Sequence, residues 1–432
     1  ERGSVYSIEE DHIDKNLIFC GTEFGVFFSP NKGDRWKELG NGLPTIAVRD
    51  IAIQKRENDL VLGTFGRGFY VMDDYSALRN IENSDVSTKA EIFPVRNALM
   101  WEKAMPLGLP GKAFQGDQFY SADNLDPVAI VSYYYNDTHK SIKDKRQKKE
   151  KEQIKSKEDT RYPSYNELYA EENEEKPKLV FTIKNSAGKV VKKIFKKPSK
   201  GLQRLNWNLR YEENNPINLS SSSFYNPFAG VSEGTLVQPG LYTIELDLYN
   251  EGSLTSLVSA VEFNVEALDN TVMPAEDRAA KVAFQRKVSI LQGEMSASGR
   301  ILSEISNKLK YIKEAVKVVE MPLGPISNTI REIELRLKDI NTRLYGDSVK
   351  RRLDIQQLPS PSNRLGSMSY EQKYSTAAPT KTHIRSFEIA KEEYMPIKEE
   401  IENLMKVDVK GLEDKLKDIG APYTPGRIME EQ

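Results

Sequence analysis

The residues best suited to ligand chemistry lie near the start of the chain, where Arg67, Tyr70 and Asp73 follow one another at intervals of three. Arg67 is placed between Gly66 and Gly68, and glycines let the backbone approach a ligand closely. We therefore predict Arg67, Tyr70 and Asp73 as a candidate binding site. Turn and strand-end positions are the favoured interpretation of the same three residues.

Hydrolysis of a glycosidic bond would need a further arrangement. Retaining chemistry requires two carboxyl groups about 5 Å apart, and the candidates in this region are Glu23, Asp50, Asp73 and Asp74. Nothing in their spacing brings a pair together. The arginines of the region also fall at unlike positions in the repeat described below; they are Arg35, Arg49, Arg56, Arg67 and Arg79. The sequence therefore predicts no catalytic residue.

The composition excludes several other kinds of site. A single cysteine, Cys20, rules out an internal disulfide and a cysteine-based zinc site. His12, His139 and His383 lie in unlike contexts, so we expect no metal and no cofactor. Basic and acidic residues nearly cancel, at 62 and 64, and give no argument for a nucleic-acid partner. No apolar run reaches the ~20 residues of a transmembrane helix.

The elements that must position the candidate site form a repeat. Gly21-Thr22 recurs as Gly63-Thr64, each pair preceded by a short apolar run and followed by glycine and aromatic residues. A period of ~40 to 50 residues with several short strands is typical of a β-propeller blade. Residues 1–80 are thus predicted to be the last blades of a propeller. Since a propeller has ~4 to 8 blades, we expect the chain to be a fragment of a longer protein.

A turn motif lies between the two copies of the repeat. Ser29, Asn31, Gly33 and Trp36 match the Asp-box, a hairpin turn written roughly Ser-x-Asp-x-Gly-x-x-Trp, with Asn31 in the Asp position. Asn31 is expected to accept hydrogen bonds from nearby backbone amides, Gly33 to supply a permissive φ, and Trp36 to pack into the blade. These four residues are interpreted as structural.

The middle of the chain is predicted to be an immunoglobulin-like β-sandwich. We expect a linker over 81–109, then about seven short strands over 110–266, separated by turns such as Asn185–Gly188 and Pro239-Gly240. A charged insertion interrupts these strands over 136–177. Its lysine-rich run, residues 140–157, could contact phosphate or a membrane surface. A solvated excursion with self-compensating charge is the favoured interpretation, because no aromatic residues are interleaved with the lysines.

The last third of the chain changes to a helical period. Apolar residues from Val288 to Val319 alternate steps of three and four, with Ser298 as a polar break. A second helix is expected over 330–344, a loop rich in Pro and Ser over 358–380, and a third helix over 387–404, kinked at Pro396. Residues 267–420 are therefore predicted to form an α-helical hairpin or three-helix bundle, followed by a tail over 421–432.

Together these segments resemble a known family. Residues 21–27, 29–36 and 63–69 resemble the closing blades of large secreted bacterial BNR/Asp-box propeller proteins, often labelled sortilin-like or "glycosyl hydrolase, BNR repeat". Residues 202–209 and 239–246 resemble the FlgD-type immunoglobulin-like strands that follow such propellers, and 420–427 resembles the usual ending. The resemblance covers most of the chain except 136–177. It implies a mainly β, multi-domain, extracytoplasmic protein (periplasmic, surface-exposed or secreted) with a helical C-terminal part.

Two functions are consistent with this organisation. The first is a non-catalytic propeller protein that binds protein, peptide or glycan, in which the sandwich and the helical bundle act as a docking or scaffold module. The bundle could then join other subunits of a cell-envelope complex. The alternative is a sialidase-like glycoside hydrolase whose active site lies on N-terminal blades outside this chain. Its arginine cluster, Tyr/Glu nucleophile pair and acidic Asp would converge on the propeller axis.

Overall fold

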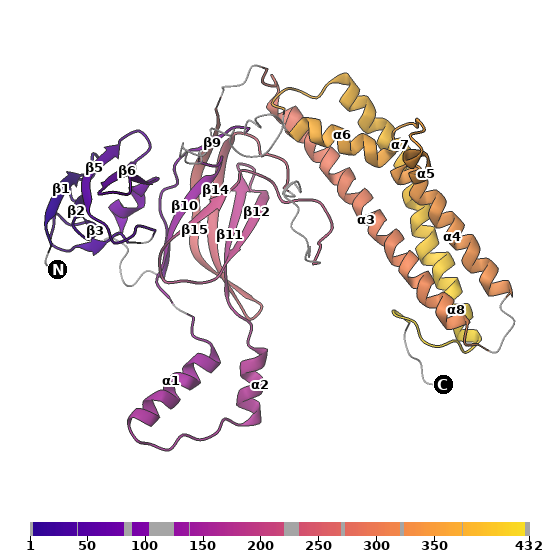
Figure 1. Ribbon diagram of the computed structural model, residues 1–432, viewed down its shortest axis with the longest axis horizontal. Coiled ribbons are helices and arrows are strands. Elements are labelled where there is room, and N and C mark those ends of the chain that lie inside the picture. Colours follow the sequence, from indigo (N-terminus) through magenta and orange to yellow (C-terminus); the bar gives the residue numbers. More distant parts are fainter. Residues whose placement is uncertain are drawn as a thin grey trace. The chain divides into compact units, whose positions relative to one another are not determined.

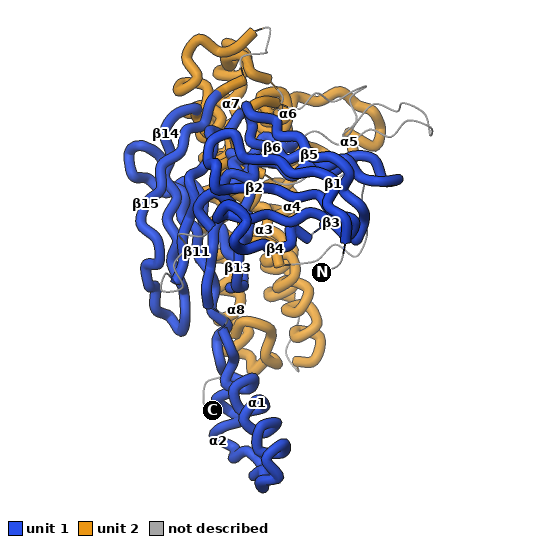
Figure 2. The backbone as a smooth tube through the Cα atoms, turned by 90° about the vertical axis from the view of Figure 1, so that its left-hand side faces the viewer, with its two compact units in different colours: residues 1–100, 124–209, 239–266 blue, residues 101–123, 210–238, 267–432 orange. Residues whose placement is uncertain are grey.

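The computed structural model describes residues 3–40, 42–81, 89–102, 125–137, 139–219, 233–268, 273–319, 324–373 and 375–427 (Figure 1). The chain divides into two compact units, which are described separately (Figure 2). The sheet unit comprises residues 1–100, 124–209 and 239–266, and the helical unit comprises residues 101–123, 210–238 and 267–432. The protein is thus sheet-rich with a helical C-terminal part, as the sequence predicts in outline.

The sheet unit begins with two antiparallel meanders. The first has strand order β1 (Val5–Glu10), β2 (Ile18–Thr22), β3 (Gly25–Ser29) and β4 (Lys37–Glu38); the second has β5 (Val48–Gln54), β6 (Asp59–Thr64) and β7 (Phe69–Met72). Apolar residues of both meanders meet in one core, which includes Phe19, Val26, Ile51 and Leu62. A short 3₁₀ helix, η1 (Tyr75–Asn80), follows β7 and adds Tyr75 to this core.

Two further sheets of the sheet unit pack against each other. One has order β13-β10-β8 and the other β12-β11-β14-β15-β9. The bounds are β8 (Ala90–Ile92), β9 (Ala98–Met100), β10 (Ala129–Tyr135), β11 (Lys178–Asn185), β12 (Val190–Lys196), β13 (Gly201–Trp207), β14 (Gly240–Asn250) and β15 (Ser253–Ala267). Aromatic rings join the two sheets: the centroid of Trp207 lies 5.3 Å from that of Tyr242, and Tyr133 lies 4.8 Å from Phe181.

The bounds of the paired sheets differ from the expected ones at two places. Part of the expected linker over 81–109 is strand, because β8 pairs with β10 and β9 joins the edge of the larger sheet. Residues 210–219, expected in the sandwich, belong to the helical unit instead, where Asn214 donates to Ser289 at 2.9 Å. Gly293 allows this contact, since a Cβ there would lie 2.3 Å from the Asn214 carbonyl oxygen. Residues 103–124 and 220–232, which fall within the expected linker and sandwich, lie outside the described residues.

The charged insertion forms a pair of helices, α1 (Ile142–Lys155) and α2 (Tyr165–Asn173), between β10 and β11. Ser141 and Ser164 each begin a helix with a capping box, which satisfies the first amide groups. No residue of either helix is buried. Residues 139–175 are called the arm below.

The helical unit is built on α3 (Arg278–Val316), α4 (Gly324–Tyr345), α6 (Pro361–Lys373) and α7 (Lys381–Asn403). Three shorter elements complete it: α5 (Ser348–Arg352), the π-helix η3 (Leu404–Val409) and α8 (Lys410–Asp418). One apolar core joins these helices and includes Ile305, Ile340, Leu365 and Ile401. None of the described helices is both long and apolar enough to cross a membrane.

The prediction of a loop over 358–380 is wrong, because helix α6 occupies residues 361–373. The helical unit is therefore more than the predicted three-helix bundle. Pro361 is the first residue of α6, a position where proline lacks only an amide that would be unpaired anyway. Leu365 and Met368 then enter the core. Pro396 lies inside α7 without ending it, and the π-helix begins eight residues later.

Candidate functional site

The two meanders share an irregularity at equivalent positions. In the first, Val5 pairs with Thr22 and Ser7 pairs with Gly21, so that Tyr6 is an extra residue in β1. In the second, Val48 pairs with Thr64 and Asp50 pairs with Gly63, so that Arg49 is the extra residue in β5. A β-bulge redirects the side chain of its extra residue and is common beside functional sites. The Gly-Thr repeat of the sequence thus marks the strand opposite a bulge in both copies.

The two bulged residues meet. The guanidinium carbon of Arg49 lies 3.9 Å from the centroid of the Tyr6 ring and 5.2 Å from that of Phe65. Tyr6, Arg49 and Phe65 are called the ring–arginine cluster. Contacts of this kind contribute ~0.5 to 1 kcal/mol at exposed sites, and they fix the orientation of a cation that otherwise has many rotamers. Within the described residues, Arg49 forms no hydrogen bond or ion pair, so its N–H groups are available to a ligand.

The β2–β3 and β6–β7 hairpins, which lie opposite the bulged strands, are also alike. The Thr22 hydroxyl donates to the Gly25 carbonyl at 3.0 Å, and the Thr64 hydroxyl donates to the Gly68 carbonyl at 2.7 Å. Each hairpin projects a phenylalanine: Phe24 is 42 % exposed and Phe65 is 69 % exposed. Single exposed apolar residues are ordinary, but rings held at matching positions of two neighbouring sheets form a surface.

Gly21 explains how closely the two meanders can approach. A Cβ atom at this position would lie 2.8 Å from the Val48 carbonyl oxygen and 2.5 Å from the Ser7 hydroxyl. No side chain fits at such distances. The first glycine of the repeat is therefore a packing requirement, which brings Tyr6 within reach of Arg49.

The three predicted binding residues do not converge. Arg67 is exposed in the β6–β7 hairpin, next to Phe65, whereas Asp73 directly follows the other end of β7. Six residues of extended chain span about 20 Å. Tyr70 packs against the core of the meanders. Arg67 alone lies in the same hairpin as Phe65 of the ring–arginine cluster, and its binding role remains a prediction.

The carboxylates considered for hydrolysis are also dispersed. Asp74 caps η1, because its side chain accepts from the Ser76 amide at 3.2 Å and the Ser76 hydroxyl at 2.6 Å. Burial and the nearby Asp59 charge raise the pKa of Asp73, while two arginines oppose that shift. Glu23 lies in the β2–β3 hairpin, at the opposite end of the meanders from Asp73 by strand order. No group of three or more metal-ligating side chains occurs among the residues that the structure describes.

The turn at 29–36 is held by its own side chains. Asn31 Oδ1 accepts from the Ser29 hydroxyl at 3.0 Å and from the Arg35 amide at 2.9 Å, while the Gly33 amide donates to Ser29 Oγ at 2.8 Å. Gly33 has φ 97°. The expected packing of Trp36 into the blade is wrong, since Trp36 is 43 % exposed and its indole covers Gly33 instead.

A buried ion pair joins the meanders to η1. Arg79 donates two hydrogen bonds to Asp11, at 2.7 and 2.9 Å, and a third to Asn58 at 2.6 Å. Tyr75 also donates to Asp11. Burial alone would raise the pKa of Asp11, but the bonds from Arg79, Tyr75 and the Asp14 amide outweigh it and hold that pKa well below its usual range. This cluster is enclosed, which favours a structural role over ligand binding. Only isolated charges in the sequence pointed to this cluster.

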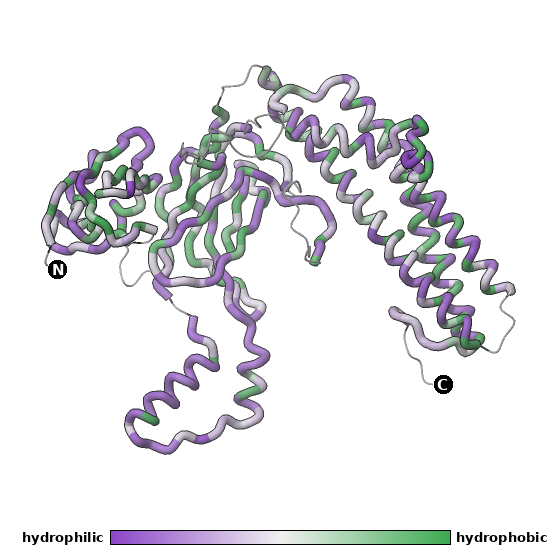
Figure 3. Tube along the Cα trace, viewed as in Figure 1, coloured by the Kyte–Doolittle hydropathy of each residue, from purple (hydrophilic) through white to green (hydrophobic). Residues whose placement is uncertain are grey.

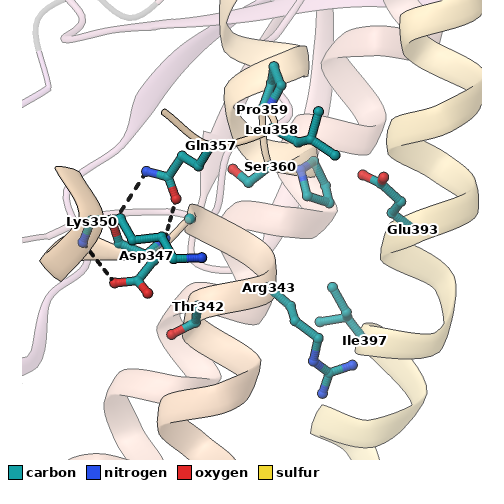
Figure 4. Close-up of a pocket in the computed structure, with 12 residues that line it drawn as sticks. Thr342, Arg343, Asp347, Lys350, Gln357, Leu358, Pro359, Ser360, Glu393 and Ile397 are labelled. Atoms are coloured by element: carbon teal, nitrogen blue, oxygen red, sulfur yellow. Dashed lines mark hydrogen bonds between the residues drawn. The ribbon is translucent and has the colours of Figure 1, made fainter. Parts of the chain in front are cut away.

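The helical unit contains a cavity of about 400 Å³ between the end of α4, α5, residues 357–361 and α7 (Figure 4). Its polar lining is engaged internally. The Asp347 amide donates to Gln357 Oε1 at 3.0 Å, and Gln357 Nε2 donates to the Asp347 carbonyl at 3.3 Å. Arg343 is bound to Asp339 and Glu400. The cavity is therefore a weaker candidate than the ring–arginine cluster.

Comparison with known proteins gives little beyond this geometry. No protein-family model and no curated protein matches the chain. Two solved structures are similar to it, the extracellular domains of proteins described as a one component system and a hybrid two component system from B. thetaiotaomicron, at 11 % and 10 % identity and a TM-score of 0.14 in both cases. The alignments cover 62 % of this chain but only 25 % and 26 % of those chains. Similarity at this level carries no inference about the ligand.

Proposed function

We propose that this chain belongs to a non-catalytic, extracytoplasmic β-propeller protein that binds a protein, peptide or glycan. Residues 1–80 would be its last blades, and the ring–arginine cluster would be part of the ligand-binding surface. The observation that carries the proposal is the placement of Arg49 over Tyr6 and Phe65 by two equivalent bulges.

The chemistry of the cluster favours binding. Exposed rings offer flat apolar faces to a sugar or an apolar side chain, and a pre-oriented guanidinium offers paired donors to a carboxylate or carbonyl group. Pre-orientation limits the entropy that is lost when a ligand binds. Arg67 would add a second cation from the same hairpin as Phe65.

The cluster does not offer the groups that hydrolysis requires. It contains neither a carboxylate pair nor a histidine, and Asp74, which follows the other end of β7, is a helix cap. No observation on the described residues favours the sialidase-like alternative, which depends on blades outside this chain.

The remaining parts of the chain would serve as a docking or scaffold module. The two paired sheets, with FlgD-type immunoglobulin-like strands as their nearest resemblance, would connect the propeller to the helical unit. Hydrogen bonds support a stiff connection within the sheet unit: Arg204 of β13 donates to the Asp74 carbonyl at 2.5 Å, and Arg96 pairs with Glu57 at 2.9 Å. The helical unit would then join other subunits of a cell-envelope complex.

Binding arrays test the proposal. The full chain is applied to glycan and peptide arrays, and the affinity of the best ligand is then measured for Arg49→Ala and Phe65→Ala. We expect at least a tenfold loss for each, in the range of an interface hot spot. Arg35→Ala is the matched control, because Arg35 is exposed in the neighbouring turn and only its backbone amide bonds Asn31. Equal affinity for the Arg49→Ala and Arg35→Ala variants would exclude the cluster as the site.

A further inference from the structure

The arm is a folded structure without a core. Its helices are held together by Arg146 of α1, whose Nη2 donates to Glu171 Oε2 of α2 at 2.9 Å and whose Nε donates to Glu171 Oε1. Glu174 adds a bond from the Ile142 amide at 2.8 Å. A helix that is polar on all sides obtains little stability from apolar burial. The arm is therefore held in shape by charge. Its helices are mostly hydrophilic (Figure 3), and neither has a buried residue.

The arm carries equal numbers of basic and acidic residues, ten of each. The two groups differ in how many of their members form contacts within the protein. Seven of the acids are engaged in caps, ion pairs or hydrogen bonds: Asp144, Glu150, Glu152, Glu167, Glu171, Glu174 and Glu175. Seven of the bases form no such contact with the described part of the chain: Lys140, Lys143, Lys145, Lys149, Lys151, Lys155 and Lys157. Helix α1 alone carries seven basic and three acidic residues, so its own charge is positive.

These lysines lie away from the contact between the two helices. The partly buried residues of α1 are Arg146, Glu150 and Gln153, spaced four and three apart, as expected for one face of a helix turned toward α2. Lys145, Lys148, Lys149, Lys151 and Lys155 are exposed on the remaining surface, within a length of about 16 Å.

Tyrosines accompany the lysines around the link between the helices. Tyr162 is 86 % exposed and Tyr165 is 77 % exposed, and Tyr165 stacks on Tyr169 with ring centroids 5.9 Å apart. Exposed tyrosines have an apolar ring and a polar hydroxyl, which suits the boundary between water and a lipid layer.

We propose that the outer face of α1 docks on an anionic phospholipid surface, with the tyrosines around the helix link at the headgroup level. The charge of the face is complementary to lipid phosphates, and lysine binds phosphate as a mobile point charge without the geometric demands of arginine. The face is an open helix surface without buried residues. Dispersed charge on an open helix suits a laterally mobile layer of headgroups, since these can rearrange beneath it. Two of the three acids of α2, Glu167 and Glu171, are paired with Arg161 and Arg146 and add no free negative charge near this face.

Vesicle co-sedimentation of the full chain tests the proposal. Vesicles of phosphatidylglycerol and phosphatidylcholine are compared with vesicles of phosphatidylcholine alone. We expect binding only to the anionic vesicles, weakening as salt rises from 50 to 500 mM because screening shortens the range of the attraction. The variant K145E/K149E/K151E should lose at least tenfold in affinity, since each lysine near an anionic bilayer contributes about fivefold.

A matched variant controls for net charge. K391E/K410E/K415E changes three exposed lysines on helices of the helical unit, for which the described residues provide no ion pair, and should bind like the unmodified chain. Circular dichroism establishes that both variants retain the fold. The proposal is overturned by absent binding to anionic vesicles, by equal binding of the arm variant, or by an equal loss in the control variant. The test is independent of the ring–arginine cluster, so its failure leaves the proposed ligand-binding function untouched.

Discussion

The Ser298 hydroxyl lies 2.8 Å from the Tyr394 hydroxyl inside the helical core, where it joins α3 to α7. Both side chains are buried. The polar break in the apolar seam of α3 is therefore half of a buried pair, which satisfies two hydroxyl groups that would otherwise be costly to bury. Such a pair fixes the register of the two helices, because a shift of one turn would leave both groups unsatisfied.

We predict that Tyr394→Phe lowers the free energy of unfolding by about 1 to 3 kcal/mol, since it leaves the Ser298 hydroxyl buried without its partner. Ser298→Ala should act in the same direction. The double variant should lose less than the sum of the two, and denaturant unfolding of all four proteins measures this coupling. Tyr311→Phe, at an exposed position of α3, is the control and should have almost no effect.

We predict that Asp11→Asn destabilises the sheet unit by about 3 to 5 kcal/mol near neutral pH, because it leaves Arg79 without its charged partner. The pKa of Asp11 is held below its usual range in the folded state. The carboxylate therefore stabilises the fold above about pH 3.9, the ordinary value for Asp, and this contribution is lost as pH falls below it.

Thermal unfolding between pH 2.5 and 7 distinguishes the two proteins. The unmodified chain should lose stability in the acid range more steeply than Asp11→Asn, and parallel profiles would contradict the assigned pKa shift. Asp34→Asn provides the control, since Asp34 is exposed and its described hydrogen bond is made by its backbone amide.

Trp36 and Trp207 should differ in how much they contribute to stability. Trp207 is fully buried between Tyr242 and Phe263, so Trp207→Ala should cost about 3 to 5 kcal/mol. Trp36 lies over a turn and is largely accessible, so Trp36→Ala should cost about 1 kcal/mol or less. Chemical denaturation, monitored by circular dichroism, gives the free energy of unfolding of each variant for comparison. A loss at Trp36 as large as that at Trp207 would contradict the observed exposure.

Removal of the arm should leave the sheets folded. Residues 140–174 can be replaced by a short Gly/Ser linker, because no residue of α1 or α2 is buried. We expect the sheet unit to unfold cooperatively on heating, with a melting temperature within a few degrees of that of the full chain. The near-ultraviolet circular dichroism signal of buried Trp207 monitors this transition. A broad, non-cooperative transition would show that the arm supports the sheets.

The sequence predicted best the elements whose pattern is local. The repeat of Gly-Thr pairs, the turn signal at Asn185–Gly188 and the apolar seam from Val288 each specify a structure over a few residues. Strand β9 was missed because a short strand at the edge of a sheet carries little periodicity of its own. Helix α6 was missed because its Ser and Pro content is typical of a loop, and only tertiary contact of Leu365 and Met368 stabilises it.

The candidate site was only partly predictable. Arg67 was identified from its flanking glycines. The contact between Tyr6 and Arg49, however, depends on two β-bulges, and a bulge becomes visible only once the pairing of the strands is known. Gly21 carried the relevant signal, since its place in the repeat marks the closest approach of the two sheets. Residues 43 apart in the chain cannot be paired from local pattern alone.

The equivalent bulges have a consequence for how such a surface can diversify. A bulged residue stands outside the pairing of its strand, so its side chain can be exchanged without disturbing the partners of Val5 and Ser7 or of Val48 and Asp50. One repeat carries tyrosine at this place and the next carries arginine. Ligand preference can therefore evolve one repeat at a time, while the sheets that hold the surface are inherited unchanged.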